Sequence, residues 1–283
     1  MKKGLILEGG AMRGMFTAGA IDVMMEQGIT FDGAVGVSAG AAFGCNYKSR
    51  QIGRAIRYNK RFCHDSRYCG LRSLLLSGNI YNTDFAYREV PLNLDVFDFA
   101  TYEANPMEFY VVCTDITTGL PIYHRYEGHR DHGFDWIRAS ASMPIVSRIV
   151  EIDGQKMLDG GICDAIPLHF FQKKGYGRNI VILTQPADYR KKKTGTMPFI
   201  RLMYRKYPQL VKAMERRHEM YNSTLEYIAQ QEAAGNILVI RPATALPVSR
   251  VEKNPENLQA AYDIGRATAT AQMEDIRVFL DRA

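Results

Sequence analysis

The segment Gly36-Val37-Ser38-Ala39-Gly40 places a serine between two glycines at the end of an apolar run. This G-x-S-x-G spacing is typical of a nucleophilic serine on a sharp turn between a strand and a helix. Because Gly36 and Gly40 lack a Cβ, the strand end and the first helical turn can approach closely, with the Ser38 hydroxyl exposed and its backbone strained. The same residues also fit a glycine-rich helix start with a serine N-cap. A catalytic interpretation therefore needs a base and an oxyanion site as well.

A glycine-rich stretch, Glu8-Gly9-Gly10-Ala11-Met12-Arg13-Gly14, follows the first apolar run of the chain. Such a turn before a helix presents unpaired N–H groups and the positive end of the helix dipole, which suits a phosphate or a developing oxyanion. A dinucleotide site would need glycine where Ala11 stands, although Asp32 could still serve as its ribose acid. An oxyanion site requires only that the turn lie beside Ser38.

The sequence around these residues predicts a repeated order of strand, turn and helix. Strands are expected at the first apolar run and at 34–37, 109–113, 179–186 and 236–242, and hairpins across 117–119 and 153–154. Helices are expected from the glycine turn to Gly28, after Ser38, irregularly over 50–88, before Pro144, and over 207–235 and 256–282. Successive strand-turn-helix units predict a parallel sheet covered by helices, whose carboxyl edge brings the two turns together.

The composition is that of an ordinary soluble globular protein, with 46% hydrophobic and 23% charged residues in 283. No stretch approaches the roughly 20 apolar residues of a membrane span, and the N-terminal residues do not resemble a cleaved signal peptide. Five cysteines without C-x-x-C spacing argue against a disulfide framework and a zinc knuckle. We therefore expect a cytoplasmic setting.

Positive charge is concentrated in two stretches. Residues 186–218 hold ten lysines and arginines but only two acidic residues. The stretch from Lys48 to Arg72 holds eight basic residues and one acidic residue, Asp65. Such stretches attract phosphates, so peripheral contact with an anionic membrane surface is one expectation, with Phe199, Leu202, Met203 and Tyr204 as inserted groups. A solvated helix face is the simpler interpretation. No nucleic-acid reader motif accompanies the charge, and no nucleic-acid partner is expected.

Four motifs in order, "EGGAMRG", "GVSAG", "RASASMP" and "DGG", give the chain a family resemblance. It resembles bacterial patatin-like phospholipases from about residue 4 to 184, and 185–283 looks like the more variable, helical C-terminal part of that family, packed on the same domain. The resemblance implies a three-layer α/β/α sandwich with a mostly parallel sheet. It also implies hydrolysis of acyl esters of phospholipids or other lipids through a Ser-Asp dyad. Neither a metal nor an organic cofactor is required for that reaction.

The resemblance assigns roles position by position. Ser38 matches the nucleophile, and Asp159, followed by Gly160 and Gly161 of the DGG motif, matches its general base. The oxyanion loop corresponds to Gly9, Gly10, Ala11, Arg13 and Gly14. Ala11 departs from the family pattern, which usually has glycine there. An alanine still donates its N–H unless the position needs a positive φ, so the change bears on loop geometry more than on chemistry.

Several alternatives stay open on the sequence. Asp115, Asp153 and Asp164 are lower-ranked candidates for the base, and His169 could complete a Ser-His-Asp triad. At the level of the whole protein, a nucleotide-binding Rossmann-type domain and a catalytically silent membrane or acyl-chain binding protein compete with the hydrolase. The acyl donor and the oligomeric state are not encoded in these motifs.

Overall fold

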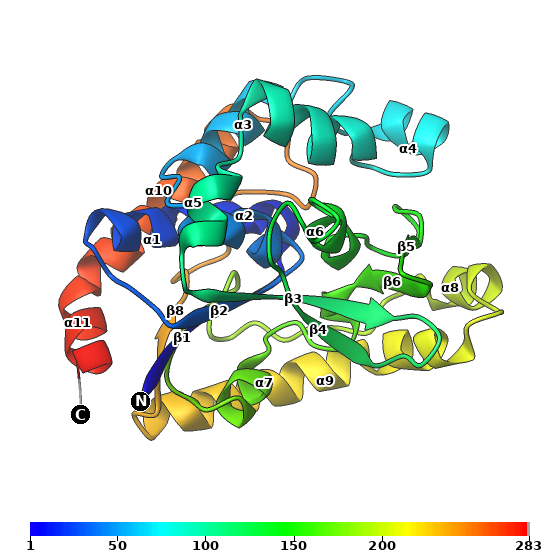
Figure 1. The fold of residues 1–283 in the computed structure, drawn as a ribbon. Coiled ribbons are helices and arrows are strands. Elements are labelled where there is room, and N and C mark those ends of the chain that lie inside the picture. The colour runs from blue at the N-terminus through cyan, green and yellow to red at the C-terminus, as the bar shows by residue number, and fades with distance from the viewer. Residues whose placement is uncertain (282–283) are drawn as a thin grey trace.

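A computed structural model describes residues 1–281, in which the strands form one mixed sheet with the order β5-β6-β3-β2-β1-β7-β8, while β4 pairs with β3 (Figure 1). The strands are β1 (Lys2–Leu7), β2 (Gly33–Val37), β3 (Glu108–Asp115), β4 (Pro121–Arg125), β5 (Val150–Ile152), β6 (Gln155–Asp159), β7 (Tyr176–Ile182) and β8 (Ile237–Ile240). β3, β2, β1, β7 and β8 run parallel. The predicted, mostly parallel sheet is thereby confirmed.

The centre of the sheet is buried on both faces, as its sequence requires. β1 and β2 are nearly continuous apolar or glycine runs, and their inner residues are fully buried. Parallel strands covered by helices on both sides need this composition, whereas a half-exposed strand would alternate. The register aligns Leu7 with Gly36, so the two strands end side by side. The turns that follow them therefore begin at the same edge.

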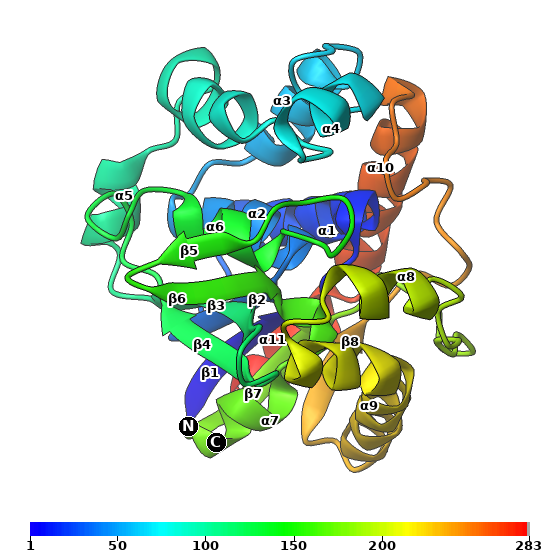
Figure 2. The ribbon, with the colours of Figure 1, turned by 90° about the vertical axis from the view of Figure 1, so that its right-hand side faces the viewer.

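Helices cover the sheet on two faces, which Figures 1 and 2 show from the front and from the right-hand side. The side that contacts Leu5 and Leu7 carries α1 (Gly14–Glu26), α2 (Ala39–Lys48), α6 (Asp135–Ser140), α10 (Pro255–Ala271) and α11 (Met273–Asp281). The side that contacts Ile6 and Val35 carries α7 (Leu168–Lys173) and α9 (Pro208–Ala233). The chain is thus a three-layer α/β/α sandwich.

The hairpins of the antiparallel edge form where the sequence predicts them. Gly119, in the turn between β3 and β4, has φ +69°. Asp153 and Gly154 both have positive φ between β5 and β6, as a two-residue Asp-Gly turn demands. This edge delivers the carboxyl end of β6 next to β3.

Residues 50–98 form a separate layer of short helices above α1 and α2 (Figure 1). It contains α3 (Arg54–Phe62), α4 (Leu71–Ser77) and a π-helix, η2 (Phe85–Leu94), and α5 (Phe99–Ala104) follows it. Arg54 and Arg57 both pair with the buried Asp95, and Lys48 lies over the Tyr102 ring. Lys48 and Arg54 are therefore committed to internal contacts, while the other six basic residues of this stretch are exposed, as the solvated-face interpretation expects.

The C-terminal region differs from the sequence prediction in one element. The single helix expected over 256–282 is two helices, because the chain bends at Gln272 between α10 and α11. The bend lets Ile276, Phe279 and Leu280 enter the core beside β7, while α10 packs along α1. No helix within residues 1–281 is long and apolar enough to cross a bilayer.

Candidate active site

The glycine turn and Ser38 meet at the carboxyl ends of β1 and β2. The turn continues as a short 3-10 helix, η1 (Ala11–Arg13), into α1, while Ser38 stands between β2 and α2. Both segments line one small polar pocket together with Asp159. The structure thus brings together the three parts that the motifs only suggested.

Ser38 occupies a strained turn. Its backbone has φ +55° and ψ −120°, a combination that L-residues other than glycine rarely adopt. The flanking glycines permit it. A Cβ at Gly36 would lie 2.5 Å from the Gly40 carbonyl oxygen, and one at Gly40 would lie 2.4 Å from that of Leu7. The side chain of Ser38 is only 8% exposed at the base of the cavities described below.

Ser140, which sequence reasoning did not single out, holds this turn. The Ser38 N–H donates to the Ser140 hydroxyl oxygen at 2.8 Å, and that hydroxyl donates in turn to the Val112 carbonyl at 2.6 Å. Ser140 lies at the end of α6, inside the motif "RASASMP". A hydroxyl in an otherwise apolar, buried position was the available signal, since such groups are nearly always hydrogen-bonded.

Asp159 ends β6 and is positioned by its neighbours on both sides. Its backbone pairs with Cys113 of β3, and the Thr114 hydroxyl donates to its carbonyl at 2.9 Å. Its carboxylate accepts the Gly161 N–H at 2.8 Å and lines the same small polar pocket as the Ser38 side chain. The side chain is 3% exposed. A buried carboxylate therefore faces the serine hydroxyl with its orientation fixed.

Burial raises the pKa of Asp159 above its ordinary value. The positive charge of Arg217, the nearby Ser38 side chain, the hydrogen bond from Gly161 and the charge of Lys191 oppose that rise. A carboxylate whose proton affinity is raised by desolvation is a better base than one in water, provided that it stays ionised at the working pH. The nearby cations favour that ionised form.

Three N–H groups of the glycine turn have no backbone acceptor in the described chain, those of Gly10, Ala11 and Met12. Gly9 donates its N–H to the Ala165 carbonyl, Arg13 donates to Gly10, and Gly14 donates to Ala11 and Met12. Ala11 has φ +50°, the left-handed conformation that glycine would adopt without strain. Of the three, Gly10 and Ala11 line the polar pocket, so the expected oxyanion loop narrows to their amides.

Glu8 fixes the base of this turn. Its buried carboxylate accepts the Thr184 N–H at 2.5 Å, the Thr184 hydroxyl at 3.1 Å and the Tyr221 hydroxyl at 2.5 Å. These bonds join the ends of β1 and β7 to α9. The loop that carries Gly10 and Ala11 is thus anchored to the C-terminal third of the chain.

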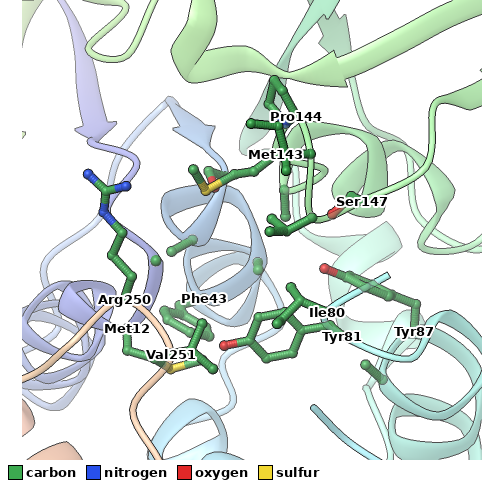
Figure 3. Close-up of a pocket in the computed structure, with 18 of the residues that line it drawn as sticks. Met12, Phe43, Ile80, Tyr81, Tyr87, Met143, Pro144, Ser147, Arg250 and Val251 are labelled. Atoms are coloured by element: carbon green, nitrogen blue, oxygen red, sulfur yellow. The ribbon is translucent and has the colours of Figure 1, made fainter. Parts of the chain in front are cut away.

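A larger cavity of about 420 Å³ opens on the other side of Ser38 (Figure 3). Its walls are mainly apolar and aromatic, and they come from η1, α2, the layer over 50–98, the segment after α6 and the loop after β8. Among the residues that Figure 3 labels are Met12, Phe43, Ile80, Tyr81, Tyr87, Met143, Pro144 and Val251. A volume of this size suits a small organic molecule, and its lining suits a hydrocarbon chain.

The alternative bases lie elsewhere. Asp115 accepts the Thr117 N–H within its own turn, Asp153 is exposed beside His132, and Asp164 accepts the Tyr123 hydroxyl. None of the three lines the two cavities at Ser38.

The histidines lie away from Ser38 as well. His169 stacks on Tyr227, and none of the six histidines lines either cavity. Within residues 1–281, no group of His, Cys, Asp and Glu has the arrangement of a metal site.

The dinucleotide interpretation is wrong for a topological reason. Asp32 precedes β2, and its carboxylate accepts the Lys3 N–H at 2.6 Å at the amino ends of the strands. A ribose-binding acid must instead follow the second strand, at the edge where the glycine turn lies. Asp32 is at the opposite edge.

Two family models match the chain. The model of the patatin-like phospholipases matches residues 5–171, and that of a domain of unknown function, DUF6363, matches residues 207–281. The uncharacterized protein YjjU of Escherichia coli is 28% identical over 277 residues, which are 93% of this chain and 74% of that protein.

Two further comparisons are more distant. Lysophospholipase NTE1 of Scheffersomyces stipitis is 28% identical over 194 residues, which are 66% of this chain but only 12% of that much longer protein. Among solved structures, VipD from Legionella pneumophila aligns with 97% of this chain and 67% of its own, with a TM-score of 0.47 and 12% identity. Since the family model covers well over half of its length, the chain belongs to the patatin-like phospholipases.

Proposed function

We propose that the protein is a serine hydrolase of lipid acyl esters, with Ser38 as nucleophile and Asp159 as general base. The observation that carries the proposal is that Ser38 and the buried Asp159 carboxylate line the same small polar pocket, close enough for the serine side chain to lower the pKa of that carboxyl. A serine hydroxyl is a weak nucleophile until a base takes its proton, and this carboxylate is in place to do so. Membership of a lipid-hydrolase family points to the same reaction class.

The proposed reaction has two steps. Ser38 Oγ attacks the ester carbonyl carbon while its proton passes to Asp159, and the negative oxygen is stabilised by the amides of Gly10 and Ala11. The tetrahedral intermediate collapses, and the leaving alcohol takes the proton from Asp159. Water then attacks the acyl-serine, Asp159 accepts a proton from that water, and the fatty acid leaves as Ser38 regains its hydrogen.

The cavity shape supports an acyl substrate. The apolar cavity begins at Ser38 and Ala11 and extends away from the polar pocket, so an acyl chain there presents its carbonyl carbon to Ser38 and its oxygen to the turn. One relative is named a lysophospholipase. We propose a phospholipase A or lysophospholipase activity on this basis.

Exposed apolar residues flank the cavity on two elements, which supports peripheral contact with a membrane. α4 exposes Leu71, Leu75 and Leu76, and α8 (Met197–Met203) exposes Phe199, Leu202 and Met203. Both helices face the viewer in Figure 2. Exposed Arg72 and Arg205 add positive charge beside them. Tyr204, expected to insert, is buried and accepts the Ile145 N–H. We propose that this face meets the bilayer surface on its cytoplasmic side.

The dyad is tested with a fluorescent fluorophosphonate and a p-nitrophenyl acyl ester series on the wild type, Ser38→Ala, Asp159→Asn and Asp164→Asn. Labelling disappears in Ser38→Ala, and turnover falls by at least about 10³-fold in both dyad variants. Asp164→Asn is the matched control, because it removes a neighbouring half-buried carboxylate that accepts the Tyr123 hydroxyl.

Two results would count against the dyad. If the wild type neither labels nor hydrolyses any ester, the motif is only a structural turn, and the silent binding protein becomes the better interpretation. If Asp164→Asn abolishes turnover while Asp159→Asn retains it, the base is misassigned.

A further inference from the structure

Four cations gather around the polar pocket beside the dyad. Arg13, Lys191, Arg217 and Arg250 line it together with Ser38 and Asp159. Arg13 belongs to the glycine turn, whereas the other three come from the C-terminal third of the chain, outside the part that the patatin-like model matches. Conventional dyad chemistry uses none of these three side chains directly.

The four cations lack carboxylate partners. None of them forms an ion pair within residues 1–281. The two carboxylates nearby accept other hydrogen bonds, Asp159 from Gly161 and Glu8 from Thr184 and Tyr221. The Nε of Arg13 is buried and has no hydrogen-bond partner. Arg217 donates its Nε–H to the Gly161 carbonyl and Arg250 is exposed, so the group that indicates a place for an anion is the buried, unpartnered Nε of Arg13 beside the other three charges.

Lys191 is held in position before any ligand arrives. Asn222 on α9 accepts the Lys191 N–H at 2.8 Å and donates to its carbonyl at 3.0 Å, and the ammonium lies 4.2 Å from the centre of the Tyr221 ring. Burial, together with repulsion from Arg217, Arg13 and Arg250, lowers the pKa of Lys191 to about 8. A bound anion would relieve that repulsion.

Arg250, an exposed residue, reaches the pocket from the loop after β8. In Figure 3 its side chain rises from the loop after β8, past Met12, with the guanidinium near Met143. It lines both the apolar cavity and the polar pocket, as Ser38 does. A planar guanidinium binds phosphate oxygens through two parallel hydrogen bonds.

We propose that Lys191 and Arg250, with Arg13 and Arg217, form a phosphate subsite that selects acyl glycerols with a net negative headgroup over zwitterionic and neutral ones. The proposal rests on the proposed function, since it places the acyl chain in the apolar cavity and the scissile carbonyl at Ser38. The glycerol then leads from Ser38 into the polar pocket. With no uncommitted carboxylate there, a choline ammonium finds no counter-charge.

The experiment compares kcat/KM for three octanoyl substrates below their micelle concentrations: 1-octanoyl-glycerol 3-phosphate, its phosphocholine analogue and 1-octanoyl-glycerol. The wild type prefers the phosphate monoester. Lys191→Met and Arg250→Gln each lower the ratio of phosphate to neutral turnover by about tenfold or more, as expected for the loss of a charged hydrogen bond. Lys192→Gln, which removes the exposed neighbouring lysine, keeps the wild-type ratio.

A binding measurement separates this proposal from the dyad. Calorimetry on Ser38→Ala measures the affinity for octanoyl-glycerol phosphate without turnover, and inorganic phosphate is titrated alongside. Binding of the lipid that weakens about tenfold in Ser38→Ala/Lys191→Met supports the subsite even if no ester is hydrolysed. Equal weakening for inorganic phosphate alone, without lipid binding, would identify a free-phosphate site and overturn the headgroup role. An unchanged substrate ratio in both single variants would overturn the proposal altogether.

Discussion

Ser140 connects three parts of the site through one hydroxyl. It accepts the amide of Ser38 and donates to the Val112 carbonyl, so it ties the strained turn to β3 and α6. The Ser38 amide is committed to this bond, so the proposed mechanism assigns the oxyanion to the glycine turn instead. We infer that Ser140 is a positioning residue.

Replacing Ser140 by alanine leaves the Ser38 N–H and the Val112 carbonyl without their shared partner. We expect a loss of about 1–3 kcal/mol in the free energy of unfolding, since buried unsatisfied groups carry that penalty. We also expect kcat to fall about 10- to 100-fold at nearly constant KM, because only the geometry of attack changes. Steady-state kinetics and denaturant unfolding measure both.

Ser142→Ala is the matched control. Ser142 lies two residues after Ser140, and its hydroxyl donates to the Arg138 carbonyl instead of contacting the Ser38 turn. A fall in kcat no larger in Ser140→Ala than in Ser142→Ala would contradict the positioning role.

For single residues, the sequence indicated which side chains could do chemistry better than it indicated which other residues they contact. Ser38, Asp159 and the glycine turn could be proposed as site residues because each carries a local pattern. Ser140, Lys191 and Arg250 could not, because their meaning depends on contacts between segments far apart in the sequence. The left-handed backbone at Ala11 was likewise invisible, since alanine carries no signal for positive φ.

The contact between α1 and α10 includes a buried acid. Asp22 on α1 accepts the Tyr262 hydroxyl of α10 at 2.7 Å and the Gly53 N–H at 2.9 Å. Burial raises its pKa to about 6, despite these hydrogen bonds and the charge of Arg266. The ionised form is thus disfavoured in the folded protein relative to the unfolded chain.

The sign of the resulting pH dependence follows from this shift. A pKa that is higher in the folded state gives stability that is fully present below the unfolded value, near 3.8, and lost as the pH rises through about 6. An asparagine side chain cannot ionise, so Asp22→Asn removes this dependence. Relative to the wild type, the variant should gain about 2–3 kcal/mol of unfolding free energy between pH 4 and pH 8.

Denaturant unfolding at several pH values measures the Asp22→Asn difference directly. Glu26→Gln on the same helix is the control, because Glu26 pairs with Arg266 and its pKa is lowered. Its stability relative to the wild type should change with pH in the opposite direction. A constant difference for Asp22→Asn between pH 4 and pH 8 would show that the acid keeps its ordinary pKa.

Elements with strong local signals were predicted well, and the exceptions have a tertiary cause. β1, β2, β7 and β8 are apolar runs bounded by turns, which leaves little ambiguity. The bend at Gln272 has neither glycine nor proline to announce it, and it forms because the apolar face of α11 is buried against the core. The π-helix η2 similarly accommodates Pro91 within a helical segment.

The molecule as a whole presents one amphipathic face. The exposed leucines of α4 and the apolar residues of α8 lie on the side that faces the viewer in Figure 2, whereas α11 lies on the far left of Figure 1. If this face meets the bilayer, Leu75→Asp and Leu202→Asp should each weaken binding to anionic vesicles by about tenfold, since inserting a leucine contributes about 1.5–3 kcal/mol.

Co-sedimentation with vesicles containing phosphatidylserine measures this binding. Val278→Asp is the matched control, because Val278 is an exposed apolar residue of α11 on the other side of the molecule. Weakening as large in Val278→Asp as in Leu75→Asp would mean that hydrophobicity alone, and not this face, determines binding.

The sequence boundary near residue 184 is not a structural boundary in the sheet. β8 extends the sheet next to β7, α10 lies along α1, and the pocket draws on both segments. We propose that residues 4–184 and 185–283 form one domain. The family resemblance indicated the core, but it could not show that the more variable segment completes the site.

The hydrogen bond from Tyr221 to Glu8 limits which chimeras of related proteins can keep this site intact. A chimera that keeps residues 1–184 and takes its last third from another family member inherits the buried Glu8 carboxylate. If the incoming helix lacks a hydroxyl at the position of Tyr221, that carboxylate loses a partner directly beneath the glycine turn. The two halves are interchangeable only as a matched pair at these positions.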